Sequence, residues 1–202
     1  FKLDDDGINN MLQLPDGNLF LIGFGKPVIF NTASFEVTTA RNDSANAVLK
    51  LTGITTLCYD DQQHIWLAAS GGKLFEYDPA TKTTTNRSSL LSSVPDLKAI
   101  YKITRQGDEF CLATNAGLIL VKKDAKLRLF LTEKPDNVLL GIRGVLQDGD
   151  YVWFANSRRI GRLHPATGRV VYIGEKEGVS RMLLYPRTLI KSPQGTVLIG
   201  SN

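Results

Sequence analysis

The sequence of 202 residues predicts an all-β fold, a partial β-propeller with about four four-stranded antiparallel blades and the start of a fifth. Three observations predict this fold. One apolar segment returns five times, its second residue falling at positions 20, 66, 111, 153 and 198, so the intervals are 46, 45, 42 and 45 residues. A turn sequence precedes every copy, and the rest of each period divides into further short strands. A period of ~40–50 residues built from strands is typical of propeller blades.

Each repeat is predicted to open with a strand and a tight turn. Residues 54–59 and 100–104 are strand-like runs, with apolar side chains at alternate positions in places. Turn sequences come before the apolar segment in all five repeats, at residues 15–17, 60–63, 105–108, 148–150 and 193–195. All of them contain Gly or Asp, which suit tight hairpin turns because they tolerate positive φ.

The recurring apolar segment is predicted to be the second strand, buried between neighbouring blades. Small residues near its end, such as Gly23 and Ala69, would let the blades approach closely. A third strand is predicted at 27–30, 73–77, 118–121 and 160–163. After a second turn, at 31–34, 78–81, 123–126 and 164–168, a fourth strand is predicted at 35–38, 82–85, 127–131 and 169–173. The fourth strand is more polar and variable, as expected at a sheet edge.

These elements place blades at about 7–52, 53–98, 99–140 and 141–184, with a partial fifth blade at 185–202. Residues 42–51 are the helix candidate, and they fall between blades. A β-solenoid is the structural alternative, although its repeating units are usually shorter. Because the fifth blade has two strands, we expect residues 1–202 to be one segment of a longer propeller.

Composition and charge exclude several classes of protein. The chain is 43% hydrophobic and 22% charged, which excludes disorder, collagen and coiled coil. It has no apolar run of ~18 residues, so contact with a membrane is expected only through segments absent from this chain. Its net charge of +4 is spread over scattered residues, so no nucleic acid partner is expected. Two cysteines, Cys58 and Cys111, exclude a disulfide scaffold and argue against a zinc site made of cysteines.

Residues 65–79, with the sequence IWLAASGGKLFEYDP, resemble the two-component regulator propeller repeat, and residues 111–118, CLATNAGL, show the same pattern. The resemblance covers nearly the whole chain. Repeats of that family build the periplasmic sensors of hybrid histidine kinases, found especially in Bacteroidetes, and many are thought to detect oligosaccharides. The resemblance therefore implies a periplasmic sensor segment without a cofactor or catalysis of its own. It would respond to an oligosaccharide and signal to a kinase carried on another part of the protein.

Two alternatives to the sensor remain open. Residues 152–168, VWFANSRRIGRLHPATG, are similar to a blade of the streptogramin (virginiamycin B) lyases, which implies an enzyme with a metal and a His-plus-carboxylate pair. The two histidines, His64 and His164, occupy different repeat positions, and neither matches the lyase motif. We therefore expect no catalytic residue and no metal site. The other alternative is a scaffold propeller that binds a protein partner.

The loops after the second strands are the candidate ligand site, because ligands of propellers usually meet the loops around the central channel. The predicted ligand-binding residues are Lys26, Ser70, Asn115, Asn156, Arg158 and Arg159. The two arginines are favoured, since a guanidinium group can pair with a carboxylate through two hydrogen bonds.

Other conspicuous residues are predicted to be structural. Trp66 and Trp153 occupy equivalent repeat positions, which favours blade packing over a stacking platform for sugar. Residues 4–6 are three aspartates, and they lack the spacing of a calcium-binding EF-hand loop. Bare blade faces and strand edges predict a homodimer or another form of self-association.

Overall fold

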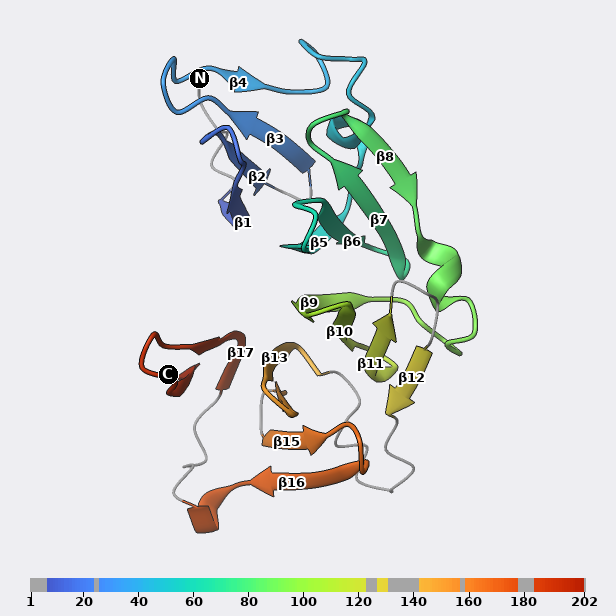
Figure 1. Ribbon diagram of the computed structural model, residues 1–202, viewed down its shortest axis with the longest axis vertical. Coiled ribbons are helices and arrows are strands. Elements are labelled where there is room, and N and C mark those ends of the chain that lie inside the picture. The colour runs from blue at the N-terminus through green and yellow to red at the C-terminus, as the bar shows by residue number, and fades with distance from the viewer. Residues whose placement is uncertain are drawn as a thin grey trace. The chain divides into compact units, whose positions relative to one another are not determined.

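The computed structural model describes residues 7–23, 26–122, 127–130, 142–156, 159–177 and 184–201, and most of their regular structure is strand (Figure 1). The chain divides into two compact units, residues 1–89 and 90–202. Within each unit, strands that follow one another in sequence pair antiparallel, and they form four four-stranded sheets and one two-stranded sheet. The predicted partial β-propeller, with four blades and the start of a fifth, is confirmed.

The first unit holds two blades. Blade one consists of β1 (Ile8–Gln13), β2 (Leu19–Gly23), β3 (Lys26–Phe30) and β4 (Val37–Thr38), and blade two of β5 (Ile54–Tyr59), β6 (Ile65–Ala69), β7 (Lys73–Asp78) and β8 (Thr83–Asn86). The two sheets share a core that includes Phe20, Ile22, Ile65, Leu67 and Tyr77. All residues of β6 are buried, as predicted for a second strand that is covered on both faces.

The second unit holds two further blades and a two-stranded sheet. Blade three consists of β9 (Ile100–Gln106), β10 (Glu109–Thr114), β11 (Gly117–Lys122) and β12 (Leu127–Phe130), and blade four of β13 (Gly144–Asp148), β14 (Tyr151–Ala155), β15 (Ile160–His164) and β16 (Arg169–Ile173). The two-stranded sheet pairs β17 (Leu184–Lys191) with β18 (Val197–Ser201). Blades three and four share a core that includes Cys111, Leu120, Val145 and Phe154.

The turns between first and second strands share a residue with positive φ, two positions before the second strand begins. Gly17, Gly107, Gly149 and Gly195 occupy the equivalent turn position with φ of 85°, 61°, 57° and 86°. In blade two the same position is Gln63, with φ of 64°. Positive φ costs a residue with a side chain roughly 1–2 kcal/mol, which accounts for glycine in four of these five turns.

Two fourth strands begin later than the sequence predicts. Phe35 and Lys82 have φ of 59° and 57°, so they belong to the preceding turns, and the strands begin at Val37 and Thr83. A residue in the left-handed region cannot continue an extended strand. The predicted strand 169–173 is confirmed as β16. The predicted turn 123–126 and residue 131 lie outside the described residues.

Helical structure in the described residues is limited to short 3₁₀ turns. They are η1 (Ala47–Lys50), η2 (Ser88–Leu91) and η3 (Glu175–Glu177). The helix candidate at 42–51 therefore contains one 3₁₀ turn, and it lies between β4 and β5 as predicted. Among the residues that the structure describes, no helix has the length and apolar character needed to cross a membrane. The aspartates at 4–6 lie outside the described residues.

The two cysteines differ in their environments. Cys111 is fully buried in the core of the second unit, and this burial, with a smaller effect from the charge of Glu109, raises the pKa of its thiol well above the ordinary value. Cys58 in the first unit is half-buried. Neither cysteine is in a disulfide.

Candidate functional site

In the first unit, the predicted ligand-binding residues lie at the connections between second and third strands. Lys26 is the first residue of β3 and is exposed. Ser70 follows β6, and its side-chain hydroxyl and backbone N–H donate to the carbonyl oxygen of Gly53 over 3.2 Å and 2.8 Å. Ser70 therefore fastens the segment that leads into β5, and Lys26 presents a positive charge at the equivalent end of blade one.

Asn115 is the equivalent residue of blade three, and its side chain binds the segment before β9. Its Oδ1 accepts hydrogen bonds from the backbone N–H groups of Lys98 and Ala99, both over 2.8 Å. Its Nδ2 donates to the carbonyl oxygen of Asp96 over 2.8 Å. The amide of Asn115 thus has a structural role in holding this loop.

Blade four brings Asn156 and Arg159 together in one connection. Oδ1 of Asn156 accepts from the backbone N–H of Arg159 over 2.9 Å, so the loop closes on itself. The side chain of Arg159 is exposed, and its charge lowers the pKa of Tyr172, although burial is the larger influence and raises that pKa overall. Arg158 lies outside the described residues. The predicted role of these residues in ligand binding stays a prediction.

The two tryptophans occupy different environments despite their equivalent positions. Trp66 is 2% exposed, which confirms its predicted packing role. Trp153 is half-buried, and the guanidinium group of Arg162 lies 5.4 Å from its ring centroid and 4.4 Å from that of Tyr151. Arginine over aromatic faces is a cation–π arrangement, and it places a positive charge on this part of blade four.

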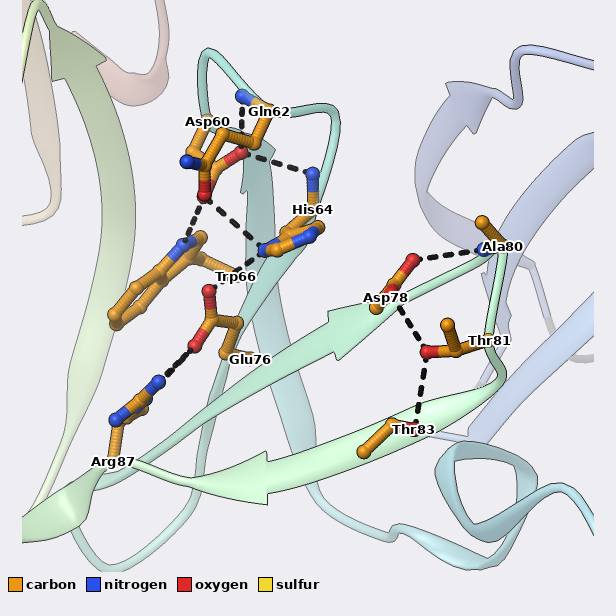
Figure 2. Close-up of polar contacts among 10 residues, drawn as sticks. All are labelled: Asp60, Gln62, His64, Trp66, Glu76, Asp78, Ala80, Thr81, Thr83 and Arg87. Carbon is orange, nitrogen blue, oxygen red and sulfur yellow. Dashed lines mark hydrogen bonds and ion pairs between the residues drawn. The ribbon is translucent and has the colours of Figure 1, made fainter.

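A polar cluster on blade two brings Asp60, His64 and Glu76 together, with one polar atom of each within 4.8 Å of the others. Figure 2 shows Asp60 at the upper end of the cluster, in the turn between β5 and β6. Oδ1 of Asp60 accepts from the backbone N–H groups of Gln62 and His64 over 2.8 Å and 2.9 Å. Oδ2 of Asp60 accepts from Nε1 of Trp66 over 3.1 Å. These bonds compensate for burial of the Asp60 carboxylate, whose side chain is 0% exposed.

Glu76 on β7 completes the cluster from the neighbouring strand. Its Oε1 lies 2.8 Å from Nδ1 of His64, and its Oε2 accepts from Nε and Nη2 of Arg87 over 2.8 Å and 2.7 Å (Figure 2). Burial alone would raise the pKa of Glu76, but the hydrogen bonds and charges of His64 and Arg87 outweigh it and lower that pKa. The Glu76 carboxylate is therefore held in its ionised form.

Sequence reasoning missed this cluster for a definite reason. Asp60 and His64 are four residues apart in a turn, but Glu76 joins them through the antiparallel register that pairs it with Trp66. The pattern of apolar residues in the sequence does not predict which residues lie opposite each other in a pair of strands. An available signal was Gln63, where the other repeats have glycine, because it marks the turn of blade two as different. His164 lies in another unit, and its Nδ1 is 3.0 Å from the Thr167 hydroxyl.

Each unit also has a surface groove with polar walls. In the first unit, a groove of about 480 Å³ is lined by side chains that include Asp16, Asn18, Asp43, Asp78 and Lys82. Lys82 forms a 3.1 Å ion pair with Asp43 across the connection between blades one and two. Figure 2 shows the neighbouring turn, in which Asp78 accepts hydrogen bonds from Ala80 and Thr81.

The groove of the second unit lies between blades three and four. It has a volume of about 540 Å³, and its lining includes Glu109, Lys122, Arg128 and His164. Arg128 pairs with Glu109 over 2.7 Å and donates to the carbonyl oxygen of Pro165 over 3.3 Å. Both grooves therefore carry charged and amide groups that can take part in hydrogen bonds.

Comparison with known proteins identifies similar folds. No protein-family model matches the sequence, and no curated protein matches it. The solved extracellular domain of BT3049 from B. thetaiotaomicron, described as belonging to a hybrid two-component system, matches with a TM-score of 0.76 and 14% identity over 100% of this chain. The extracellular domain of BT4673, a second such system from the same organism, matches with a TM-score of 0.75 and 18% identity over 99% of this chain. The chain spans 28% and 26% of those two chains.

A weaker similarity connects the chain with an enzyme. Virginiamycin B lyase from Staphylococcus aureus matches with a TM-score of 0.64 and 12% identity, over 98% of this chain and 71% of that one. The resemblances inferred from the sequence are thus reproduced by the fold, in the same order of strength. At these identities the similarity establishes the propeller architecture.

Proposed function

We propose that the chain is an extracytoplasmic ligand-sensing segment of a two-component system, which binds an oligosaccharide and passes the signal to a kinase. The observation that carries the proposal is the match of almost the entire chain to the extracellular domains of two such systems. The segment spans about a quarter of those domains, so the kinase and the membrane anchor would belong to other parts of the protein.

The described residues support a binding role in two ways. Lys26 and Arg159 present positive charges at the predicted ligand loops, and the two grooves carry carboxylate, amide and ammonium groups. Such groups suit sugar hydroxyls and acidic sugars. A sugar would change signalling only by binding one packing arrangement of the blades or subunits more tightly than another.

Thermal denaturation of the purified chain with a panel of neutral and acidic oligosaccharides tests the binding role. We expect the melting temperature to rise with one class of oligosaccharide, and above the Kd to follow the logarithm of its concentration, because a ligand that binds the folded state stabilises it. A melting temperature unchanged by every class would contradict sugar sensing. Capture of one stoichiometric protein partner would then favour the scaffold alternative.

The predicted loop residues are tested on the sugar that gives the shift. Changing Arg158 and Arg159 together to Ala should weaken binding of an acidic sugar, while Arg41→Ala with Arg169→Ala, at exposed positions outside these loops, serves as a charge-matched control. Equal binding by the loop variant and the control would remove these arginines from the site.

The lyase is the second candidate, favoured by the similarity to virginiamycin B lyase. Incubation of the chain with virginiamycin B and a divalent metal ion, followed by mass spectrometry, distinguishes the two functions. A sensor segment leaves the antibiotic intact. Cleavage of the antibiotic, lost in His64→Ala or His164→Ala, would establish the enzyme and refute the sensor proposal.

A further inference from the structure

We propose that Asp60, His64 and Glu76 form a binding site for a divalent transition-metal ion of the zinc type. Oδ2 of Asp60, Nδ1 of His64 and Oε1 of Glu76 converge, and all three atoms lie within 4.8 Å of one another (Figure 2). Nδ1 is 2.8 Å from Oε1 and 3.7 Å from Oδ2. Ligands of a tetrahedral zinc ion stand about 3–3.5 Å apart, given zinc–ligand bonds of about 2.0–2.2 Å, so small side-chain shifts suffice.

Hydrogen-bond partners fix the orientation of both carboxylates. Two backbone N–H groups hold Oδ1 of Asp60, and Trp66 donates to Oδ2, which still faces His64. Arg87 bonds only Oε2 of Glu76 in the contacts described, and this leaves Oε1 directed at the imidazole. Outer partners of this kind fix the ligands of metal sites and strengthen binding.

The charge and the access of the cluster also suit a cation. A metal binds the neutral form of the imidazole, and around it two carboxylates and one guanidinium then leave a net charge of −1. The side chains of Asp60 and Glu76 are 0% and 11% exposed, whereas that of His64 is 27% exposed and gives an entry path. A metal would take the place of the hydrogen between Nδ1 and Oε1. Neutral His64 would then carry its proton on Nε2, and an imidazolium would release one proton to solvent.

The donor set distinguishes the class of metal. One imidazole nitrogen and two carboxylate oxygens, with room for water, are typical of zinc and its neighbours among the transition metals. Calcium and magnesium prefer sites made of oxygen alone. The proposal rests on the geometry of blade two, and it holds or fails independently of the sensor function.

Titration of the untagged chain with zinc by calorimetry tests the site. We expect one equivalent to bind, and His64→Gln or Glu76→Gln to weaken binding by about tenfold or more. The matched control is His164→Gln, which removes the other histidine and should bind zinc as the parent chain does. Far-ultraviolet circular dichroism shows that each variant is folded.

Cobalt gives an independent reading of the same site. With Trp153→Phe in the background, Trp66 is the remaining tryptophan, and cobalt at Asp60 should quench its fluorescence in the parent but not in His64→Gln. The proposal would be overturned by absence of saturable zinc binding, or by zinc binding that is equal in the parent and in His64→Gln. Tighter binding of calcium than of zinc would also overturn it, in favour of a site made of oxygen.

Discussion

At the residue scale, the close contact of Gly161 with Phe154 leaves no room for a side chain at position 161 of blade four. A Cβ atom built on Gly161 would lie 2.2 Å from Cζ of Phe154, because the aromatic ring covers the glycine across the β14–β15 pair. Phe154 is 2% exposed and belongs to the core that blades three and four share. The ring cannot move without disturbing that core.

We predict that Gly161→Ala lowers the free energy of unfolding by about 1–3 kcal/mol, because the ring must leave its packed position. Urea denaturation measures the change. Gly23→Ala is the control, since a Cβ atom there has nothing within 4 Å. Equal losses in the two variants would show that the contact with Phe154 carries no special cost.

Sequence reasoning reached some of these residues and not others. It assigned Trp66 to packing because the repeat period places it in a buried strand. It overlooked the pairing of Glu76 with His64, because both side chains look like surface residues until the strand register is known. It included Asn115 and Ser70 among six candidate ligand residues, although their polar atoms bond to the neighbouring backbone.

At the scale of the element, the turn between β5 and β6 is the exception among five equivalent turns. Gln63 adopts a φ of 64° where the other four turns have glycine. The turn also carries Asp60 and His64, so its conformation positions the polar cluster.

We predict that Gln63→Gly raises the stability of the chain by up to about 1 kcal/mol, since glycine has no Cβ to clash at positive φ. The reciprocal variant, Gly17→Ala, should lower stability by about 1–2 kcal/mol. It isolates the backbone effect, because a Cβ atom at Gly17 would meet nothing within 4 Å. Chemical denaturation measures the free energy of unfolding of both variants. A Gln63→Gly chain that is less stable than the parent would contradict the prediction.

An ion pair between elements makes a second prediction at this scale. Lys191 on β17 binds Asp148 on β13, and this hydrogen bond lowers the pKa of Asp148, with smaller contributions from Trp153 and Arg162. The unfolded chain therefore takes up the proton first as the pH falls. The contribution of the pair is complete above the ordinary pKa of about 4 and is lost as the pH falls through the lower pKa of the folded state.

Asp148→Asn and Lys191→Met should each flatten the loss of stability below about pH 4. Melting temperatures measured across the acid range test this expectation. Acid sensitivity identical to that of the parent in both variants would mean that the pair contributes nothing to the pH dependence.

At the scale of the whole molecule, apolar side chains are exposed on the first blade and on the two-stranded sheet. Met11 of β1 and Leu198 of β18 are 58% and 46% exposed, and Ile8 and Ile190 lie exposed on β1 and β17. β1 is also an edge strand of its sheet. Exposed apolar edges of this kind favour association.

We predict that the chain self-associates at high concentration and that Met11→Lys with Leu198→Lys reduces the association. Sedimentation velocity over a range of concentrations measures it. The control is Phe35→Lys, which changes an exposed aromatic residue of a turn. A parent chain that stays monomeric at all concentrations would refute the prediction.

The sequence repeat made the architecture predictable, because the same pattern of strands and turns recurs in every blade. Glycine marks four of the five turns in the sequence. Apolar runs that end in small residues mark the second strands. The starts of the fourth strands were predicted wrongly at 35 and 82, because Phe35 and Lys82 adopt a conformation that their residue types do not suggest. The polar cluster of Asp60, His64 and Glu76 could be recognised only in the three-dimensional structure, since Glu76 comes from the neighbouring strand β7.

The contrast between the cysteines has a practical consequence. The Cys111 thiol can react with a thiol reagent only when the core of the second unit opens. Its rate of modification in native buffer therefore measures how often that core opens. With Cys58 replaced by Ser, the reaction reports on opening of the second unit alone. The dependence of its rate on reagent concentration yields the free energy of opening.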